Sequence, residues 1–283
     1  METGNSTNHN TFKHALINQI NLEQCILSIR ILPDGLSLFI HQSKEQKLLY
    51  TFYQPTLNNN SVLDSITVLW KEEPLLRQSF SSCRVFVQPI HSIWVPAQLF
   101  SLDSLDLFLE AQIPYEKEYQ LVKYDFHFSW DAYHVYCINK QLHEFLGKNV
   151  SGDISYLNDL NFVFNYSKQI KSIQKKVFYA ENDFGVDIWM LEGSKLIFHQ
   201  SFNNIINNED IIFRIFSCLE VTDFDFVDDI FYIIGNITEE RYNKVYTYVK
   251  SIHKLDYYSV LKFPIKEIKK APEGALVYRV LES

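Results

Sequence analysis

Apolar and polar positions along the chain alternate in short runs that predict strands and helices in a fixed order. An apolar run from Cys25 to Ile31 predicts a strand, and the turn residues Pro33, Asp34 and Gly35 follow it. Proline fixes φ in such a turn and glycine tolerates a positive φ, so the next run is predicted to fold back as a hairpin. From Leu36 onward the side chains alternate in type with the period of a strand.

Three more elements complete this first group. A third strand is predicted over Lys47 to Tyr53 and a fourth over Arg84 to Gln88. Between them, four apolar residues at helical spacing predict a helix with one buried face. These residues are Val62, Ile66, Leu69 and Trp70. The order is therefore strand, strand, strand, helix, strand.

The same order returns in the second half of the chain. Three strands are predicted over Val177 to Ala180, Gly185 to Leu191 and Lys195 to Phe202. A helix follows, capped by Asn207 or Asn208, with a buried stripe of Ile212, Ile215, Phe216 and Leu219. A strand over Ile230 to Ile234 and a helix from about Thr238 to Ser251 come next. The sequence KLLY at 47–50 is similar to KLIF at 195–198, and this similarity favours two related halves.

Additional elements lie between the two groups. Helices are predicted over Leu102 to Ala111 and Lys140 to Leu146, and strands over Tyr119 to Phe128 and Ala132 to Ile138. Hairpins followed by crossover helices indicate an α/β protein with mixed sheets flanked by helices, in two tandem ribonuclease-H-like subdomains. We expect a poorly ordered tail over 1–21, a first subdomain with an inserted segment over 22–172, and a second subdomain over 173–283.

Composition and charge narrow the class of protein. Only 8 residues are glycine, which leaves little material for glycine-rich loops that bind phosphate. The net charge of −8 argues against a nucleic-acid or anionic-membrane partner, because such proteins bind through Lys and Arg. Neither a membrane-spanning apolar run nor a signal-peptide pattern occurs, so we expect a cytoplasmic protein. Four widely spaced cysteines, Cys25, Cys83, Cys137 and Cys218, are expected to be reduced core thiols.

Two segments resemble a known family. Leu27 to Ser37 (LSIRILPDGLS) and Leu191 to Leu196 (LEGSKL) are similar to an uncharacterised family of Bacteroidetes-type bacteria, domain-of-unknown-function family 3822. The similarity extends from about residue 22 to the C-terminus and consists of strand patterns. That family resembles the actin-like ATPase (ASKHA) superfamily, nearest to its pilus-assembly and cell-division members. The resemblance implies two duplicated subdomains around a central cleft.

The chain departs from that superfamily where nucleotide would bind. Active members place an Asp-x-Gly-Thr/Ser turn after the first strand of each half, where the Asp positions a metal-bound water and backbone amides hold phosphate. Here the corresponding positions of a degenerate nucleotide cleft are Asp34, Gly35, Asp183, Gly185 and Gly235. The double glycine is missing in the second half, and Gly235 stands alone. We therefore expect no ATP hydrolysis, no catalytic residue and no resident cofactor, with ATP or ADP binding as the alternative.

Four other groups of residues have both a structural and a functional interpretation. Asp223, Asp225, Asp228 and Asp229 alternate with apolar residues and are expected to form a half-exposed connection rather than a Mg²⁺ site. His134 and Cys137 lie three apart on one predicted strand and point to opposite faces, so no metal site is expected there. Two lysine groups are expected to be solvated, with phosphate or RNA binding as the alternative. They are Lys168, Lys171, Lys175 and Lys176, and Lys262, Lys266, Lys269 and Lys270.

The sequence leads to a non-catalytic actin-like scaffold or adaptor that binds another protein. The alternative is a degenerate nucleotide-binding protein that uses the cleft between the two halves, and a weaker one is a nucleic-acid accessory factor that uses the lysines. The high share of aromatic residues, 15% of the chain, favours the scaffold hypothesis. An exposed aromatic patch in the structure would support it further. The partner, the oligomeric state and the process served are not encoded in any motif.

Overall fold

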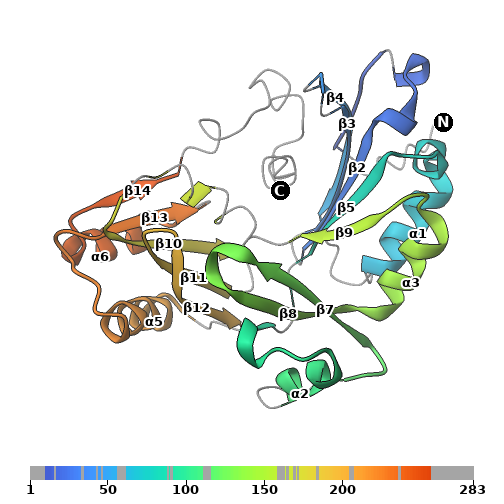
Figure 1. Cartoon of the computed structure of the whole chain (residues 1–283). Coiled ribbons are helices and arrows are strands. Elements are labelled where there is room, and N and C mark those ends of the chain that lie inside the picture. The colour runs from blue at the N-terminus through green and yellow to red at the C-terminus, as the bar shows by residue number, and fades with distance from the viewer. Residues whose placement is uncertain are drawn as a thin grey trace. The chain divides into compact units, whose positions relative to one another are not determined.

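The computed structural model describes residues 10–15, 17–32, 35–42, 44–45, 47–55, 62–87, 89, 92–110, 116–157, 163, 166–167, 170, 172–182, 185–203, 207–234 and 237–255 (Figure 1). These residues fall into two compact units. The first comprises the described residues within 10–127 and 131–157, and the second those within 128–130 and 163–255. Each unit has its own sheet and its own core.

The first unit contains a six-stranded sheet of order β1-β4-β3-β2-β5-β9. β2, β5 and β9 are parallel, whereas β1, β4, β3 and β2 pair in antiparallel fashion. The strands are β1 (Asn10–Lys13), β2 (Ile26–Leu32), β3 (Gly35–Gln42), β4 (Lys47–Pro55), β5 (Ser82–Val87) and β9 (Ile154–Leu157). The predicted hairpin is confirmed, because β2 and β3 pair from Leu32 with Gly35 onward.

One face of this sheet forms the main core of the unit. Leu27 and Ile29 of β2 and Leu38 of β3 are fully buried and point to the same side, as the period of a strand requires. The helices α1 (Val62–Glu72) and α3 (Lys140–Asn149) cover that side. Ile66, Leu69 and Trp70 of the predicted α1 stripe supply the contacts, and in α3 Leu142 and Leu146 do so. Asn139 caps α3 by accepting a hydrogen bond from the backbone N–H of Leu142 at 2.9 Å.

A smaller antiparallel sheet of order β6-β8-β7 follows in the first unit. Its strands are β6 (Ser92–Pro96), β7 (Gln120–His127) and β8 (Ala132–Asn139). The helix α2 (Leu105–Glu110) packs on β6 and β8, where Leu109 contacts Val95, Val135 and Cys137. The predicted helix over 102–111 is therefore shorter, because a 3-10 turn (Leu102–Ser104) precedes it.

The second unit contains a five-stranded sheet of order β12-β11-β10-β13-β14. Its strands are β10 (Lys175–Asn182), β11 (Gly185–Glu192), β12 (Lys195–Asn203), β13 (Ile230–Ile234) and β14 (Ile252–Lys254). The helices α5 (Asn208–Val221) and α6 (Glu239–Tyr248) pack on one face of the sheet. In α5 the fully buried positions are Ile211, Ile215, Cys218 and Leu219, whereas the predicted Ile212 and Phe216 are only partly buried.

The two larger sheets have matching plans. β4-β3-β2-β5-β9 and β12-β11-β10-β13-β14 have the same order and the same directions. Each has a bulge at the same point, which leaves Leu49 of β4 and Ile197 of β12 without a facing residue. These two residues are the third positions of the similar segments KLLY and KLIF, so the likeness in sequence coincides with a likeness in backbone. Gene duplication and the boundary at 172/173 remain predictions.

Other expectations can be compared directly with the structure. Part of the predicted tail over 1–21 forms β1, which pairs with β4, and Ile17 is buried in the core. All four cysteines are buried and free, as predicted. Among the helices that the structure describes, none combines the length and apolar character that a membrane crossing requires.

Candidate functional site

The predicted site lies where parallel strands end. In the second unit β10 and β13 are parallel, so their carboxyl ends meet at one edge of the sheet. β11 begins at the same edge with Gly185, and α5 and α6 begin beyond it. We call this region the carboxyl edge. Open α/β sheets bind ligands at such edges, and helix N-termini there attract anions.

An ion pair occupies the carboxyl edge. Arg241, in the first turn of α6, contacts the carboxylate of Glu181 near the end of β10. The guanidinium also donates to Asn208 Oδ1 through Nη2 at 2.8 Å and Nε at 3.2 Å. Tyr179 Oη donates to Glu181 Oε2 at 2.7 Å. Burial opposes the charge of Arg241, but the contacts with Glu181 and Tyr179 outweigh this and raise its pKa.

Both helix N-termini at this edge are capped by the chain itself. Asn207 Oδ1 accepts from the backbone N–H of Asp210 at 2.9 Å, and Thr238 Oγ1 accepts from that of Arg241 at 3.3 Å. Glu209 and Asp210 add negative charge to the first turn of α5. The guanidinium and both caps are thus engaged internally, which disfavours a bound phosphate at this position.

The predicted nucleotide-cleft residues are only partly described. Gly35 and Gly185 each begin the second strand of a hairpin, opposite Leu32 and Asn182 respectively. Gly35 has φ 153°, a conformation that residues with a side chain rarely adopt, so its backbone explains the glycine without a ligand. Asp34, Asp183 and Gly235 lie outside the described residues.

Buried polar side chains lie on the face of the first-unit sheet opposite the core, together with Phe39 and Phe86. Ser28 Oγ lies 3.2 Å from His41 Nε2, and Arg84 is the register partner of Ser28 on β5. Burial, and then the charge of Arg84, lower the pKa of His41 to about 3. Arg30 lies two residues after Ser28 on the same face of β2 and is almost fully buried. This face therefore holds His41 as a neutral imidazole.

The second-unit sheet has a related cluster of Asp187, His199 and Ser201. Ser201 Oγ donates to Asp187 Oδ1, and His199 Nε2 lies 3.4 Å from Ser201 Oγ and 3.9 Å from Asp187 Oδ1. A serine–histidine–aspartate triad needs the carboxylate on one imidazole nitrogen and the hydroxyl on the other. Here both approach Nε2, and the imidazole stacks on Trp189, so the cluster is not a nucleophilic triad. Burial lowers the pKa of His199 to about 4.

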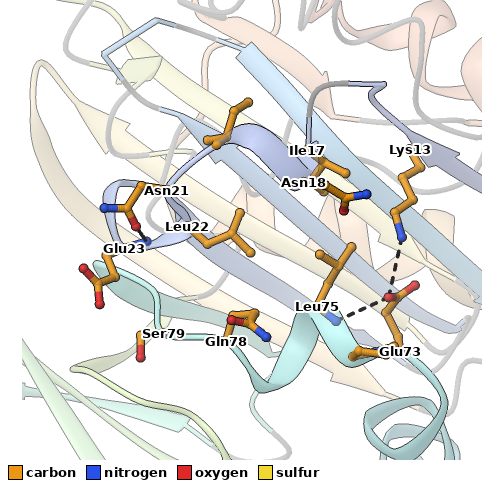
Figure 2. Close-up of a pocket in the computed structure, with 12 residues that line it drawn as sticks. Lys13, Ile17, Asn18, Asn21, Leu22, Glu23, Glu73, Leu75, Gln78 and Ser79 are labelled. Carbon is orange, nitrogen blue, oxygen red and sulfur yellow. Dashed lines mark hydrogen bonds and ion pairs between the residues drawn. The ribbon is translucent and has the colours of Figure 1, made fainter.

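A hollow of about 590 Å³ lies at the edge of the first-unit sheet where the parallel strands β2 and β5 begin (Figure 2). It is bounded by the 3-10 turns Ile17–Gln19, Leu22–Gln24 and Pro74–Arg77, just before β2 and β5 begin. Glu73 lines the hollow. Its Oε1 lies 3.9 Å from Lys13 Nζ and accepts a hydrogen bond from the backbone N–H of Leu75 at 3.3 Å. With amides and carboxylates in its lining, the hollow suits a neutral polar or cationic molecule rather than an anion.

Aromatic rings in mutual contact, which we call the aromatic surface, lie on the face of the small sheet on which α2 packs. Its members are Phe100, Phe108, Tyr124, Phe126 and Tyr133. Phe100 stacks on Tyr133 with ring centroids 3.6 Å apart, and Tyr124 approaches Phe100 at 5.3 Å. Tyr124 is 42% exposed and Phe126 40%. Because α2 packs on β6 and β8, these two residues of β7 remain accessible.

The family model described as protein of unknown function (DUF3822) matches residues 14–252 of the chain. The chain belongs to this family. No curated protein matches it. The predicted family is thus confirmed, and no DUF3822 function comes with it.

Two solved structures establish the fold of this DUF3822 chain. One is a Bacteroides thetaiotaomicron protein with an actin-like ATPase fold and unknown function, at 16% identity and a TM-score of 0.74, covering 87% of this chain and 96% of the other. The other is the PilM–PilN type IV pilus biogenesis complex, at 10% identity and a TM-score of 0.59, covering 90% and 97%. At these identities the likeness shows fold alone, and it confirms the predicted actin-like ATPase architecture.

Two minor predictions about the DUF3822 chain can be refined. Lys176 is fully buried, not solvated as predicted, because its Nζ donates to the carbonyls of Ile170 at 3.3 Å and Ser172 at 3.4 Å. Asp229 is buried too and accepts the backbone N–H groups of Lys175 at 2.9 Å and Asp225 at 2.8 Å. Lys168, Lys171 and 262–270 lie outside the described residues. Within the described part of the chain no group of three metal-binding side chains occurs.

Sequence reasoning missed the ion pair at the carboxyl edge. Its signal is an arginine in the first turn of α6, where the positive helix end disfavours a cation. Such a residue needs a compensating carboxylate, and Glu181 comes from a strand that is distant in sequence. An exposed aromatic patch is the feature that supports the scaffold hypothesis, but no sequence pattern identifies Phe100 and Tyr133 as its members.

Replacing Glu181 by Gln is expected to destabilise the second unit by about 3 kcal/mol, because it leaves the Arg241 charge buried without its carboxylate. Urea unfolding, monitored by tryptophan fluorescence, gives the free energy of unfolding. The double variant Glu181→Gln/Arg241→Met should recover most of the loss. Glu220→Gln, which changes an exposed carboxylate on α5, is the control and should change little. An equally small loss of unfolding free energy in Glu181→Gln and in the control variant would contradict the assigned role of Glu181.

The low pKa of His199 predicts stability that is lost in acid. The unfolded chain binds a proton near pH 6.5 and the folded one only near pH 4, so stability is full above pH 6.5 and falls as the pH drops toward 4. Between pH 7 and pH 5 the expected loss from this residue is about 2 kcal/mol. His199→Phe, which retains stacking on Trp189, should remove that share of the pH dependence. The exposed His253→Phe variant should keep the full pH dependence. An equal dependence of stability on pH in the two variants would refute this account.

Proposed function

We propose that this protein is a non-catalytic actin-like scaffold or adaptor that binds another protein through the aromatic surface. The observation that carries the proposal is a group of five aromatic rings in mutual contact, of which Tyr124 and Phe126 remain two-fifths exposed. Exposed aromatic clusters mark protein interaction sites, because large rings supply contact area at low entropic cost. Leu99, Leu102 and Leu107, which flank Phe100 and Phe108 in the chain, are exposed as well.

The fold is compatible with partner binding. One of the solved structures that share it is a complex, that of PilM with PilN. This supports an actin-like domain in the role of a binding partner but names no partner for the present chain.

Nucleotide binding ranks second. It is favoured by the convergence of two helix N-termini and Arg241 at the carboxyl edge, which is the kind of site that phosphate prefers. Glu181 and the caps Asn207 and Thr238 weigh against it, because a phosphate must displace a carboxylate that is already hydrogen-bonded. This competition lowers nucleotide affinity and leaves the aromatic surface as the stronger basis for function.

Photo-crosslinking in cells tests the proposed function. With benzoylphenylalanine in place of Tyr124, illumination is expected to give a discrete crosslinked product with another protein, identified by mass spectrometry. The additional change Phe126→Ala should reduce its yield roughly tenfold, since truncation of a buried interface ring costs this much or more. The matched control is benzoylphenylalanine at Phe213, a 70% exposed ring on α5 of the second unit. No product at Tyr124, or equal products at both positions, would contradict the proposal.

A further inference from the structure

The hollow at the start of β2 and β5 has two walls that come from distant parts of the chain. One wall is the segment over 13–23, which leads from β1 into β2, and the other is the segment over 73–79, which leads from α1 into β5. Both segments belong to the first unit. The volume of about 590 Å³ is in the range of sites that hold a small molecule.

Two carboxylates lie at opposite ends of the hollow. Figure 2 shows Glu23 at one end and Glu73 at the other, next to Lys13. The Glu73 carboxylate is held in place, because it accepts from the backbone N–H of Leu75 at 3.3 Å and from the hydroxyl of the buried Tyr50. Its side chain is still 20% exposed, and Glu23 is exposed. Carboxylates that are accessible in this way favour a ligand with positive charge.

The surface between the two carboxylates is apolar. Leu22 and Leu75 lie between Glu23 and Glu73 in Figure 2. Leu22 is buried in the core and Leu75 is half-buried. A small metal ion does not suit this surface, because it requires several oxygen ligands around one point. An aliphatic chain does suit it, because its methylene groups leave water when they lie on the leucines.

Lys13 is the cation with which a ligand would compete. Its Nζ lies 3.9 Å from Glu73 Oε1, and its side chain is 46% exposed. An ion pair this long and this exposed contributes little to stability. A ligand ammonium can therefore replace Lys13 beside Glu73 at small cost.

We propose that the hollow binds an aliphatic diamine or polyamine, with one ammonium group at Glu23, one at Glu73 and the methylene chain on Leu22 and Leu75. The amide oxygens of other lining residues, such as Asn18, can accept further N–H groups of the ligand. The hollow and the aromatic surface lie on different sheets, so the inference goes beyond the proposed function and does not depend on it.

Isothermal titration calorimetry of the full chain with α,ω-diaminoalkanes, from diaminopropane to diaminodecane, tests this at low ionic strength. Affinity should pass through a maximum at the chain length that spans the two carboxylates. A monoamine of that length should bind about fivefold more weakly, because it forms one surface ion pair fewer. A steady rise of affinity with chain length would show binding by the apolar surface alone, and affinity independent of length would show general attraction to an acidic protein. Either result would overturn the proposal, as would the absence of binding.

Charge variants locate the site. Glu23→Gln and Glu73→Gln should each weaken the best diamine about fivefold and remove its advantage over the monoamine. Lys13→Gln should strengthen diamine binding about threefold, because it removes the competing cation. Glu72→Gln and Lys71→Gln make the same changes of charge at exposed positions of α1 outside the lining, and should leave affinity almost unchanged.

Circular dichroism confirms that each variant is folded. If Glu73→Gln does not fold, Glu23→Gln and Lys13→Gln still decide, because both of these side chains are exposed. Equal effects of the lining variants and their α1 controls would overturn the proposed site.

Discussion

Arg241 is only 7% exposed, so its charge must be compensated within the molecule, and at the carboxyl edge of the second sheet Glu181 provides this. The pair fixes the positions of the elements that meet there, because Glu181 lies near the end of β10, Arg241 opens α6 and Asn208 opens α5. Removal of either charge leaves the other buried and unsatisfied. The same contacts that hold the edge together therefore take up the groups that would otherwise attract a phosphate.

The charged groups at the carboxyl edge are thus bound to one another within an actin-like ATPase fold. The sheets retain the plan of an actin-like ATPase, including a hairpin opened by Gly35 in one unit and Gly185 in the other. Their polar faces hold neutral imidazoles, His41 and His199, whose pKa values burial lowers. None of these groups is arranged as a nucleophile with a base. Accessible aromatic rings are found instead on the small sheet, at Tyr124 and Phe126 of β7.

Much of the fold follows from local pattern, and most departures have a physical cause. The hairpin at Gly35 was predictable because proline and glycine encode the turn, and α1 because its stripe has a single period. β6 escaped prediction because it is short and ends in Pro96, and β14 because its three residues directly follow a helical pattern. β1 comes from a polar segment whose pairing with β4 supplies what its composition lacks.

The candidate site was less predictable than the fold, because long-range partners define it. Arg241 is unusual for the first turn of a helix, but only the structure shows that Glu181 compensates it. Lys176 belongs by composition to a solvated group, yet β10 places it inside the unit, where carbonyls of the preceding segment receive its protons. Single-sequence patterns record the period of a strand and not which distant residue meets its side chain.

We propose that the side chains at the carboxyl edge close it to nucleotide. A thermal-shift titration of the full chain with ATP, ADP and GTP, with and without Mg²⁺, tests it most directly. A ligand that binds only the folded state must raise the melting temperature. The account predicts no rise at millimolar nucleotide. A concentration-dependent rise that Arg241→Met abolishes would contradict it.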